Sequence, residues 1–261
     1  MIKAVILAGG YGSRISEETI NKPKPLIQIG QKPIIWYIMN HYSKFGIKNF
    51  KVAAGYKVEM MKEYFMNIDI INSDLQISYK KKSIKYNKKF FYDWDIGVYN
   101  TGLGTQTGSR IKKLEKFLKL KNKSDFFVMT YGDGLCDIDV SKLIKFHKKH
   151  GKIATVTAVR PPARFGYLEI KKNLVKNFKE KEKSHEGWIN GGYFVLSKKV
   201  FDYLDIEESC VFERKPMEKL SEDGQLMAYK HDSFWQCMDT KRDHEYLENM
   251  LKRKEEFFKN D

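Results

Sequence analysis

Short apolar runs alternate with amphipathic stretches along the first half of the chain. The first run, residues 2–8 (IKAVILA), is rich in β-branched residues and has the length of a strand covered on both faces. Apolar residues then recur at helical spacing after Pro33, until Gly46 ends the pattern. Further strands are predicted over residues 50–54, 75–79 and 98–102 and within 125–134, with helices over residues 58–66 and 110–118. This alternation predicts an α/β fold, with a Rossmann-like, mixed and mainly parallel sheet flanked by helices.

The second half of the chain departs from this alternation. Residues 161–170 and 174–181 predict a small β-hairpin that leaves the sheet. The remaining elements are helices over residues 140–150 and 212–220, strands over 153–160, 187–196 and 226–231, and a final helix. Residues 80–94 are basic and aromatic with no clean period, so we expect an excursion from the sheet, and the charged end (252–261) is expected to fray. No repeat or linker divides the chain, which predicts a single domain over residues 1–261.

The composition supports a globular protein with a basic surface. Apolar residues make up 42% of the chain and aromatic residues 14%, enough for a substantial core. The formal net charge is +15, but only seven of the 48 basic residues are arginine. Nucleic-acid grooves favour clustered arginine, whereas these lysines are scattered over most predicted helices. We therefore expect a solvated lysine-rich surface that attracts small anionic substrates, and no nucleic-acid partner.

The cysteines and the N-terminus bear on the expected compartment. The three cysteines show no CxxC pair and no zinc-ligand spacing, which favours reduced thiols. The first residues enter a strand directly rather than forming a signal peptide, and no apolar run has the length of a membrane span. These features predict a cytoplasmic protein without a membrane partner.

A glycine-rich turn follows the first predicted strand. Residues 9–14 (GGYGSR) place three glycines in four positions and end on Arg14. Glycine lets the main chain approach a ligand closely, so that successive N–H groups can bind phosphate. Residues 22–25 (KPKP) then present Lys22 and Lys24 on a stiff, extended segment. The turn lacks the third glycine of a dinucleotide fingerprint and the Gly-Lys-Ser/Thr of a P-loop, so it predicts a different type of phosphate site.

Further candidate groups follow later strands. A second glycine-rich loop (GLGTQTGS) precedes Arg110, which we expect at the start of a helix beside free backbone N–H groups. Asp133 follows a buried strand, where ligands of open parallel sheets bind, and a carboxylate there suits Mg²⁺. Asp239 is a second candidate carboxylate, just before the final helix. Asn190 precedes a glycine pair and is either an ordinary turn residue or a partner for sugar hydroxyls.

Four other polar residues are expected to be structural. Asp137 and Asp139 lie close to the next predicted helix, where they suit a turn and an N-cap. His147 and His150 are one helical turn apart without a nearby carboxylate, so we expect surface residues rather than metal ligands.

These motifs together resemble the sugar-nucleotide pyrophosphorylases, a family of sugar nucleotidyltransferases. The resemblance rests on LAGG, G-S-R and K-P-K-P, and it extends over nearly the whole chain. The segments SEET, TYGDG, PPARFG, INGGYFVL and FWQCMDT are similar to the branch of glucose-1-phosphate cytidylyltransferases. Members of that branch transfer a cytidylyl group from CTP to α-D-glucose 1-phosphate, with release of pyrophosphate and formation of CDP-glucose. The resemblance also implies a homo-oligomer.

The resemblance implies a site that the matching positions of this chain would form. Residues 1–160 would be the nucleotide-binding half and residues 161–261 the sugar-phosphate-binding half. The implied nucleotide-binding residues are Leu7, Ala8, Gly9, Gly10, Tyr11, Gly12, Ser13, Arg14, Lys24, Thr105, Arg110 and Gly132. The implied Mg²⁺ ligands are Asp133 and Asp239, and the implied sugar-phosphate residues are Glu180, Lys181 and Asn190. Arg14, Lys24, Asp133 and Asp239 would carry the catalysis.

Three positions depart from the family pattern and keep other functions open. Glu182 and Cys237 stand where the family has proline, and Asn100 stands where it has aspartate. These departures concern sugar or base recognition, so the same chemistry with another sugar or polyol phosphate, or with UTP or dTTP, is an alternative. An alternative of another class is a non-catalytic, nucleotide-sensing subunit that keeps the fold.

Overall fold

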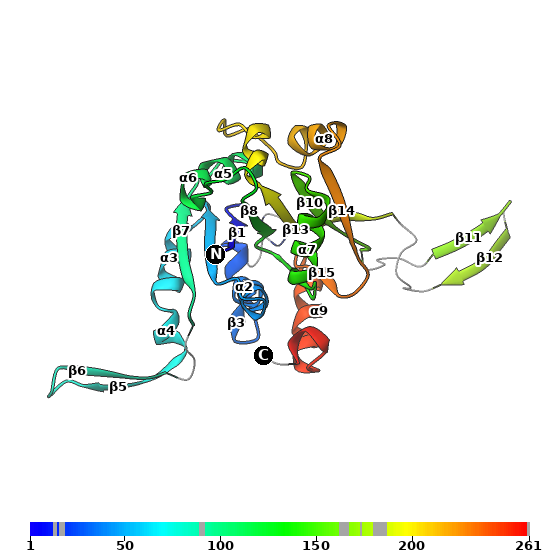
Figure 1. The fold of residues 1–261 in the computed structure, drawn as a ribbon. Coiled ribbons are helices and arrows are strands. Elements are labelled where there is room, and N and C mark those ends of the chain that lie inside the picture. Colours follow the sequence, from blue (N-terminus) through cyan, green and yellow to red (C-terminus); the bar gives the residue numbers. More distant parts are fainter. Residues whose placement is uncertain are drawn as a thin grey trace.

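The computed structural model describes residues 1–12, 15, 19–88, 92–161, 167–172, 174–179 and 187–259. Seven strands of this part form one central sheet (Figure 1). In spatial order they are β14 (Leu226–His231), β10 (Ala154–Val159), β13 (Ile189–Ser197), β8 (Phe126–Tyr131), β1 (Lys3–Ala8), β4 (Asn49–Ala54) and β7 (Asp95–Asn100). β13 is antiparallel to both of its neighbours, and the other four pairings are parallel. The predicted mixed, mainly parallel sheet is confirmed.

Helices pack on both faces of this sheet. They are α2 (Ile34–Lys44), α3 (Val58–Met66), α4 (Ile68–Ile71), α5 (Thr107–Lys113), α6 (Glu115–Leu118), α7 (Val140–His150), α8 (Lys215–Glu222) and α9 (Lys241–Lys252), with 3-10 turns η2 (Lys24–Leu26), η3 (Lys198–Tyr203) and η4 (Glu256–Phe258). Alternate residues of β1 enter two separate apolar clusters. Ile6 belongs to the cluster that includes residues of α2, α7 and α9, and Val5 to the cluster that includes residues of α5, α6 and α8. Both faces of β1 are therefore covered, as its unbroken apolar run predicts.

The order of the strands creates a switch point beside β1. The chain moves outward from β1 to β4 and β7, and then returns to the opposite side of β1 to form β8. Ligands of open α/β sheets bind beyond the carboxyl ends of the strands at such a point. The glycine turn follows β1 and Asp133 follows β8, so both lie at this edge.

The strand predicted over residues 75–79 is present, but its expected place in the mainly parallel sheet is wrong. Strand β5 (Ser73–Ser78) pairs with β6 (Ser83–Lys88) in an antiparallel hairpin that projects from the body (Figure 1). Leu75 and Ile77 remain 44% and 50% exposed, which a central strand would not allow. The excursion expected near residues 80–94 begins with this hairpin. The strand that pairs with β4 at this edge of the sheet is β7, which overlaps the strand predicted over residues 98–102.

The second predicted hairpin is confirmed. β11 (Tyr167–Lys171) and β12 (Leu174–Lys179) pair antiparallel outside the central sheet. Two shorter antiparallel pairs complete the described strands: β2 (Gln28–Ile29) with β3 (Lys32–Pro33), and β9 (Gly134–Cys136) with β15 (Trp235–Cys237). Within the described ranges, the structure contains no helix that is both long and apolar enough to span a membrane.

The last described turn of the charged C-terminal segment, η4, is packed rather than frayed, contrary to the prediction. Phe258 is 1% exposed, and its ring meets that of Tyr37 edge-on with centroids 5.3 Å apart. The last ten residues are mostly charged but include the adjacent Phe257 and Phe258, and the 3-10 turn η4 places Phe258 in the core. Burial of this aromatic ring stabilises the packing of η4 against the body of the protein.

Two expectations about polar residues also need correction. His147 is buried, not on the surface, and its Nδ1 lies 2.8 Å from the Thr155 hydroxyl. Asp139 is the N-cap of α7 as predicted, accepting a hydrogen bond from the Lys142 N–H, but Asp137 forms an ion pair with His231. His147 contacts Thr155 on β10, the next strand along the chain, and Asp137 contacts His231 at the end of β14. Residue spacing within one helix or turn reveals neither contact.

Candidate active site

Three segments distant in sequence meet at the switch point. Lys24, which opens η2, donates hydrogen bonds to Asp133 Oδ2 at 2.7 Å and to Asp239 Oδ1 at 2.6 Å. Lys24 is only 7% exposed. Burial alone would lower the pKa of its ammonium, but the two carboxylates outweigh burial and raise the pKa above its ordinary value. The cluster thus presents two convergent carboxylates around one buried cation.

Backbone contacts fix the two carboxylates relative to each other. Strands β9 and β15 pair antiparallel, and the Met238 N–H donates to the Asp133 carbonyl at 2.8 Å. On the other side, the Asp239 N–H donates to Asp243 Oδ2 at 3.1 Å. Asp243 also completes the capping box of α9 with Thr240. Asp239 therefore lies directly ahead of a well-capped helix, as its sequence position suggests.

Cys237 lies next to this pair of carboxylates. Its Sγ is 3.9 Å from Asp239 Oδ2. Burial, with the nearby Asp239 and Asp133, raises the pKa of the thiol to about 12. The thiol is therefore protonated at neutral pH and is a poor nucleophile.

The glycine turn is packed directly against Lys24. Gly12 has φ +67°, and a Cβ there would lie 2.8 Å from Thr19 Cγ2 and 3.1 Å from Lys24 Cβ. Position 12 therefore requires glycine for both its conformation and its space. The segment after β8 also lies close to the end of β1, because the Gly132 N–H donates to the Leu7 carbonyl at 2.9 Å. Leu7, Gly132 and Gly12 thus line one edge, beside Lys24.

The other predicted residues at the end of β1 and in the first glycine turn make fewer close contacts. Ala8 ends β1, while Gly10 is exposed and has open space on its Cβ side. Tyr11 is 53% exposed, with its ring 5.4 Å from that of Tyr56. Ser13 and Arg14 lie outside the described residues.

Arg110 differs from its prediction, because its guanidinium faces carbonyl oxygens rather than free N–H groups. The side chain is 4% exposed and donates to Gly9 O and Gly102 O, both at 2.9 Å. It also donates to the Thr101 hydroxyl at 2.5 Å. Burial lowers the pKa of Arg110, although Glu208 acts in the opposite direction. Arg110 thus ties the two glycine loops together; a contact with ligand stays a prediction.

The second glycine loop is held by its own polar contacts. Thr105 is buried, and its hydroxyl donates to the Thr101 carbonyl at 2.7 Å. Lys113 Nζ donates to the same hydroxyl at 3.0 Å. Hydrogen bonds among its own residues and Lys113 therefore hold this loop in place. Nucleotide binding by Thr105 stays a prediction.

Asn190 lies on β13, beside the carboxyl end of β8. Its Nδ2 donates to the Tyr131 hydroxyl at 3.2 Å, and its Oδ1 accepts from the Gly192 N–H at 2.8 Å. Tyr131, the last residue of β8, also bonds to Glu213. Burial and the Glu213 carboxylate raise the pKa of Tyr131 well above its usual range. Glu180 and Lys181 lie outside the described residues.

Tyr131 and Glu213 also lie at this site, although no sequence motif singles them out. Tyr131 immediately precedes Gly132 at the carboxyl end of β8, so the rule that placed Asp133 could have found it. Glu213 precedes α8 and reaches Tyr131 only through the tertiary fold, so no local signal marks it.

The fold is that of an α/β protein with an open, mainly parallel sheet, and a glycine turn and two carboxylates meet at its switch point, where ligands of such sheets bind. The family model "Nucleotidyl transferase" matches residues 3–254. The chain belongs to this family, so it is a nucleotidyltransferase-type enzyme.

Curated relatives indicate a particular activity within this family. Glucose-1-phosphate cytidylyltransferase of Salmonella typhimurium (strain LT2) is 44% identical over 252 residues, which cover 97% of this chain and 96% of that protein. A probable glucose-1-phosphate cytidylyltransferase of Bacillus subtilis (strain 168) is 40% identical over 92% of both chains. This chain is therefore similar over nearly its whole length to proteins of that one activity, as the motif resemblance predicts.

Solved structures support the fold. HddC from Yersinia pseudotuberculosis, complexed with GMP-PN, superimposes with a TM-score of 0.69 at 22% identity, covering 96% of this chain and all of that one. The inositol-1-phosphate CTP transferase from T. maritima gives a TM-score of 0.64 at 16% identity, covering 98% of this chain and 97% of that one. At these identities the likeness concerns the fold alone.

Proposed function

We propose that this protein transfers a cytidylyl group from CTP to α-D-glucose 1-phosphate and releases pyrophosphate. The observation that carries the proposal is the 44% identity to glucose-1-phosphate cytidylyltransferase over 97% of the chain. The cluster of Lys24, Asp133 and Asp239 supports it, because it brings a buried cation and two carboxylates to the edge of the sheet where nucleotides bind.

The reaction needs alignment and charge neutralisation more than a protein nucleophile. A phosphate oxygen of the sugar 1-phosphate attacks the α-phosphorus of CTP and forms a new P–O bond. The bond from the α-phosphorus to the bridging oxygen breaks, and pyrophosphate leaves with those electrons. The attacking oxygen is already anionic, so no strong base is required.

The donor set of Asp133 and Asp239 fits a divalent cation of the Mg²⁺ type. Both side chains offer hard carboxylate oxygens, and one oxygen of each already lies within 2.7 Å of a single cationic group, the Lys24 ammonium. Mg²⁺ is commonly held by one or two carboxylates together with substrate phosphates. Such an ion, when bound, would neutralise developing charge on the α-phosphate.

We assign the remaining roles from charge and position. Backbone N–H groups of residues 9–12, with Arg14, would bind the β- and γ-phosphates that leave as pyrophosphate. Lys24 would neutralise charge at the α-phosphate, and its raised pKa keeps it protonated at neutral pH. Lys181 would receive the sugar phosphate, and Asn190 the sugar hydroxyls. Arg110 would act as a positioning residue that holds both glycine loops.

A substrate panel tests the proposal directly. Purified protein is given Mg²⁺, one of CTP, UTP, dTTP, ATP or GTP, and one of several sugar or polyol phosphates, while pyrophosphate release is measured. We expect the highest kcat/KM for CTP with glucose 1-phosphate. A clear preference for another pair would reassign the substrate within the same chemistry. Nucleotide binding without turnover for every pair would favour the sensing subunit instead.

We also propose that the protein is a homo-oligomer. Leu75 pairs with Tyr86 and Ile77 with Ile84 across the β5–β6 hairpin, so these four side chains share one face. Each is between 44% and 54% exposed. An isolated two-stranded hairpin gains stability when such a face is covered. Light scattering should give a multiple of 30.7 kDa, and Ile77→Lys should reduce that mass; a wild-type monomer would refute the proposal.

A further inference from the structure

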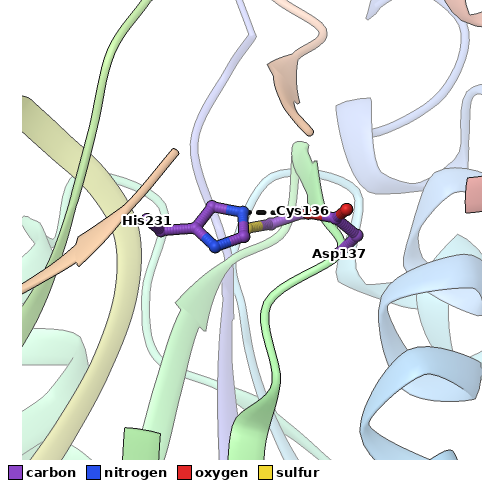
Figure 2. Close-up of side chains that lie close together, drawn as sticks. All are labelled: Cys136, Asp137 and His231. Carbon is purple, nitrogen blue, oxygen red and sulfur yellow. Dashed lines mark ion pairs between the residues drawn. The ribbon is translucent and has the colours of Figure 1, made fainter. Parts of the chain in front are cut away.

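A second group of metal-ligating side chains lies outside the active site. Cys136 ends β9, Asp137 follows it, and His231 ends β14. Their donor atoms all lie within 4.8 Å of one another. Figure 2 shows the His231 ring beside the Cys136 sulfur, with the Asp137 carboxylate facing the same ring. The group combines sulfur, nitrogen and oxygen ligands in one place.

This cluster is largely buried, and its imidazole and carboxylate groups contact each other. Cys136 is fully buried, and the side chains of His231 and Asp137 are 10% and 22% exposed. Asp137 Oδ1 is inaccessible to solvent and finds no hydrogen-bond donor of good geometry among the described residues. His231 Nε2 lies 2.9 Å from this oxygen, as an ion-pair contact. This contact holds the Asp137 carboxylate against the His231 ring, and a cation bound by both groups would replace it.

Neighbouring groups hold the three side chains in place. The Ser233 hydroxyl donates to Asp137 Oδ2, and the Asp137 N–H donates to the Phe234 carbonyl at 3.2 Å. Burial raises the pKa of the Cys136 thiol, although the Ile138 N–H favours its thiolate. Without a metal the thiol is therefore protonated, and binding of a metal would release that proton. Hydrogen bonds of this kind orient ligands in established metal sites.

We propose that Cys136, Asp137 and His231 bind a divalent transition metal of the Zn²⁺ type, with water as the fourth ligand. Thiolate and imidazole favour Zn²⁺, whereas Mg²⁺ and Ca²⁺ prefer oxygen ligands alone. This site is separate from the proposed cytidylyl transfer and does not depend on it.

The position of the cluster indicates a structural role. Cys136 pairs with Trp235 across the β9–β15 sheet, the same sheet that Asp133 precedes and Asp239 follows. His231 stands at the start of the short connection from β14 to β15. A metal ion held by all three side chains would join this connection to the end of β9. It would thereby support the backbone that brings the two active-site carboxylates together.

Zinc content and cobalt spectroscopy test the proposal without using enzyme activity. The protein is stripped with a chelator, loaded with Zn²⁺ against a competing chromogenic chelator, and loaded separately with Co²⁺. We expect one Zn²⁺ per chain and a sulfur-to-cobalt charge-transfer band. The band should persist in Cys210→Ser and Cys237→Ser and disappear in Cys136→Ser. Zn²⁺ affinity should fall by at least about tenfold in His231→Ala, and should weaken as the pH decreases.

The three cysteine variants separate the possible outcomes. Loss of the band in Cys237→Ser with its retention in Cys136→Ser would place the metal beside Asp239 and overturn the proposal. Failure of the wild-type protein to bind stoichiometric Zn²⁺ would overturn it as well. If Cys136→Ser does not fold, as judged by circular dichroism, His231→Ala and Asp137→Asn carry the test. Unchanged Zn²⁺ affinity in both of these would refute the site.

Discussion

Replacing Asp239 with asparagine keeps the shape of the side chain and removes its charge from the active-site cluster. Asp239 Oδ1 lies 2.6 Å from Lys24 Nζ, and its side chain is 15% exposed. Two unit charges at this separation attract by about 6 kcal/mol at an effective dielectric constant of about 20. Most of this attraction offsets the desolvation of both groups, and hydrogen bonds to charged groups contribute about 1.5–3 kcal/mol to stability. We expect stability to change by no more than this.

The effect of Asp239→Asn on turnover should be larger than its effect on folding. The substitution removes one of the two carboxylates that we assign to the divalent cation. We expect kcat to fall at least about 100-fold, which corresponds to about 3 kcal/mol of transition-state stabilisation. The assay is pyrophosphate release at saturating CTP and glucose 1-phosphate over a series of Mg²⁺ concentrations.

A matched variant makes this result interpretable. Asp139→Asn changes another aspartate in the same way, at the N-cap of α7, where it accepts from the Lys142 N–H at 2.9 Å. Asparagine is an equally good N-cap, so this variant should retain wild-type turnover. If Asp239→Asn kept kcat within about threefold of wild type at every Mg²⁺ concentration, the role assigned to Asp239 would be refuted.

Three further substitutions test the packing around the site. Gly12→Ala should lower the free energy of unfolding by at least about 1–2 kcal/mol, because Gly12 has φ +67°. Gly10→Ala should have little effect, because the space around a Cβ at Gly10 is open, and equal denaturation midpoints for the two variants would contradict this prediction. Arg110→Met should lower the free energy of unfolding by about 2–4 kcal/mol in urea denaturation, because the Gly9 and Gly102 carbonyls lose their hydrogen-bond donor. The control is the same substitution at the exposed Arg253, and similar losses of stability in both variants would contradict a role for Arg110 in holding the two loops together. Burial lowers the pKa of His147 to about 4, below its unfolded value of about 6.5, so its contribution to stability is present above pH 6.5 and is lost as the pH falls toward 4. His147→Asn should therefore flatten the fall of the thermal midpoint between pH 7 and pH 4, and an unchanged slope would count against this assignment.

The sheet was predictable because its strands are marked locally. The unbroken apolar run of β1 indicates burial on both faces, and Gly9 and Asp133 follow strands that the sequence also marks. The hairpin β5–β6 was misassigned because the alternation of Leu75 and Ile77 is the same whether a strand is central or at the surface. Period-2 alternation specifies a strand, but its pairing partner depends on long-range contacts.

The site was predictable in part. Lys24, Asp133 and Asp239 were singled out from three separate motifs, and the structure brings them into direct contact. The contacts of Arg110 could not be predicted, because the carbonyls it meets belong to two loops that only the tertiary fold places side by side. Phe258 was missed for a similar reason, since its burial depends on Tyr37 rather than on its charged neighbours.

The most direct test is to locate the divalent cation relative to Asp133 and Asp239. Crystals grown with Mn²⁺ and a non-hydrolysable CTP analogue would show the metal by its anomalous scattering. We predict a peak within coordination distance of both carboxylates and of the α-phosphate, beside the turn at residues 9–12. A peak that contacts neither carboxylate, with the nucleotide still bound, would contradict the proposed mechanism.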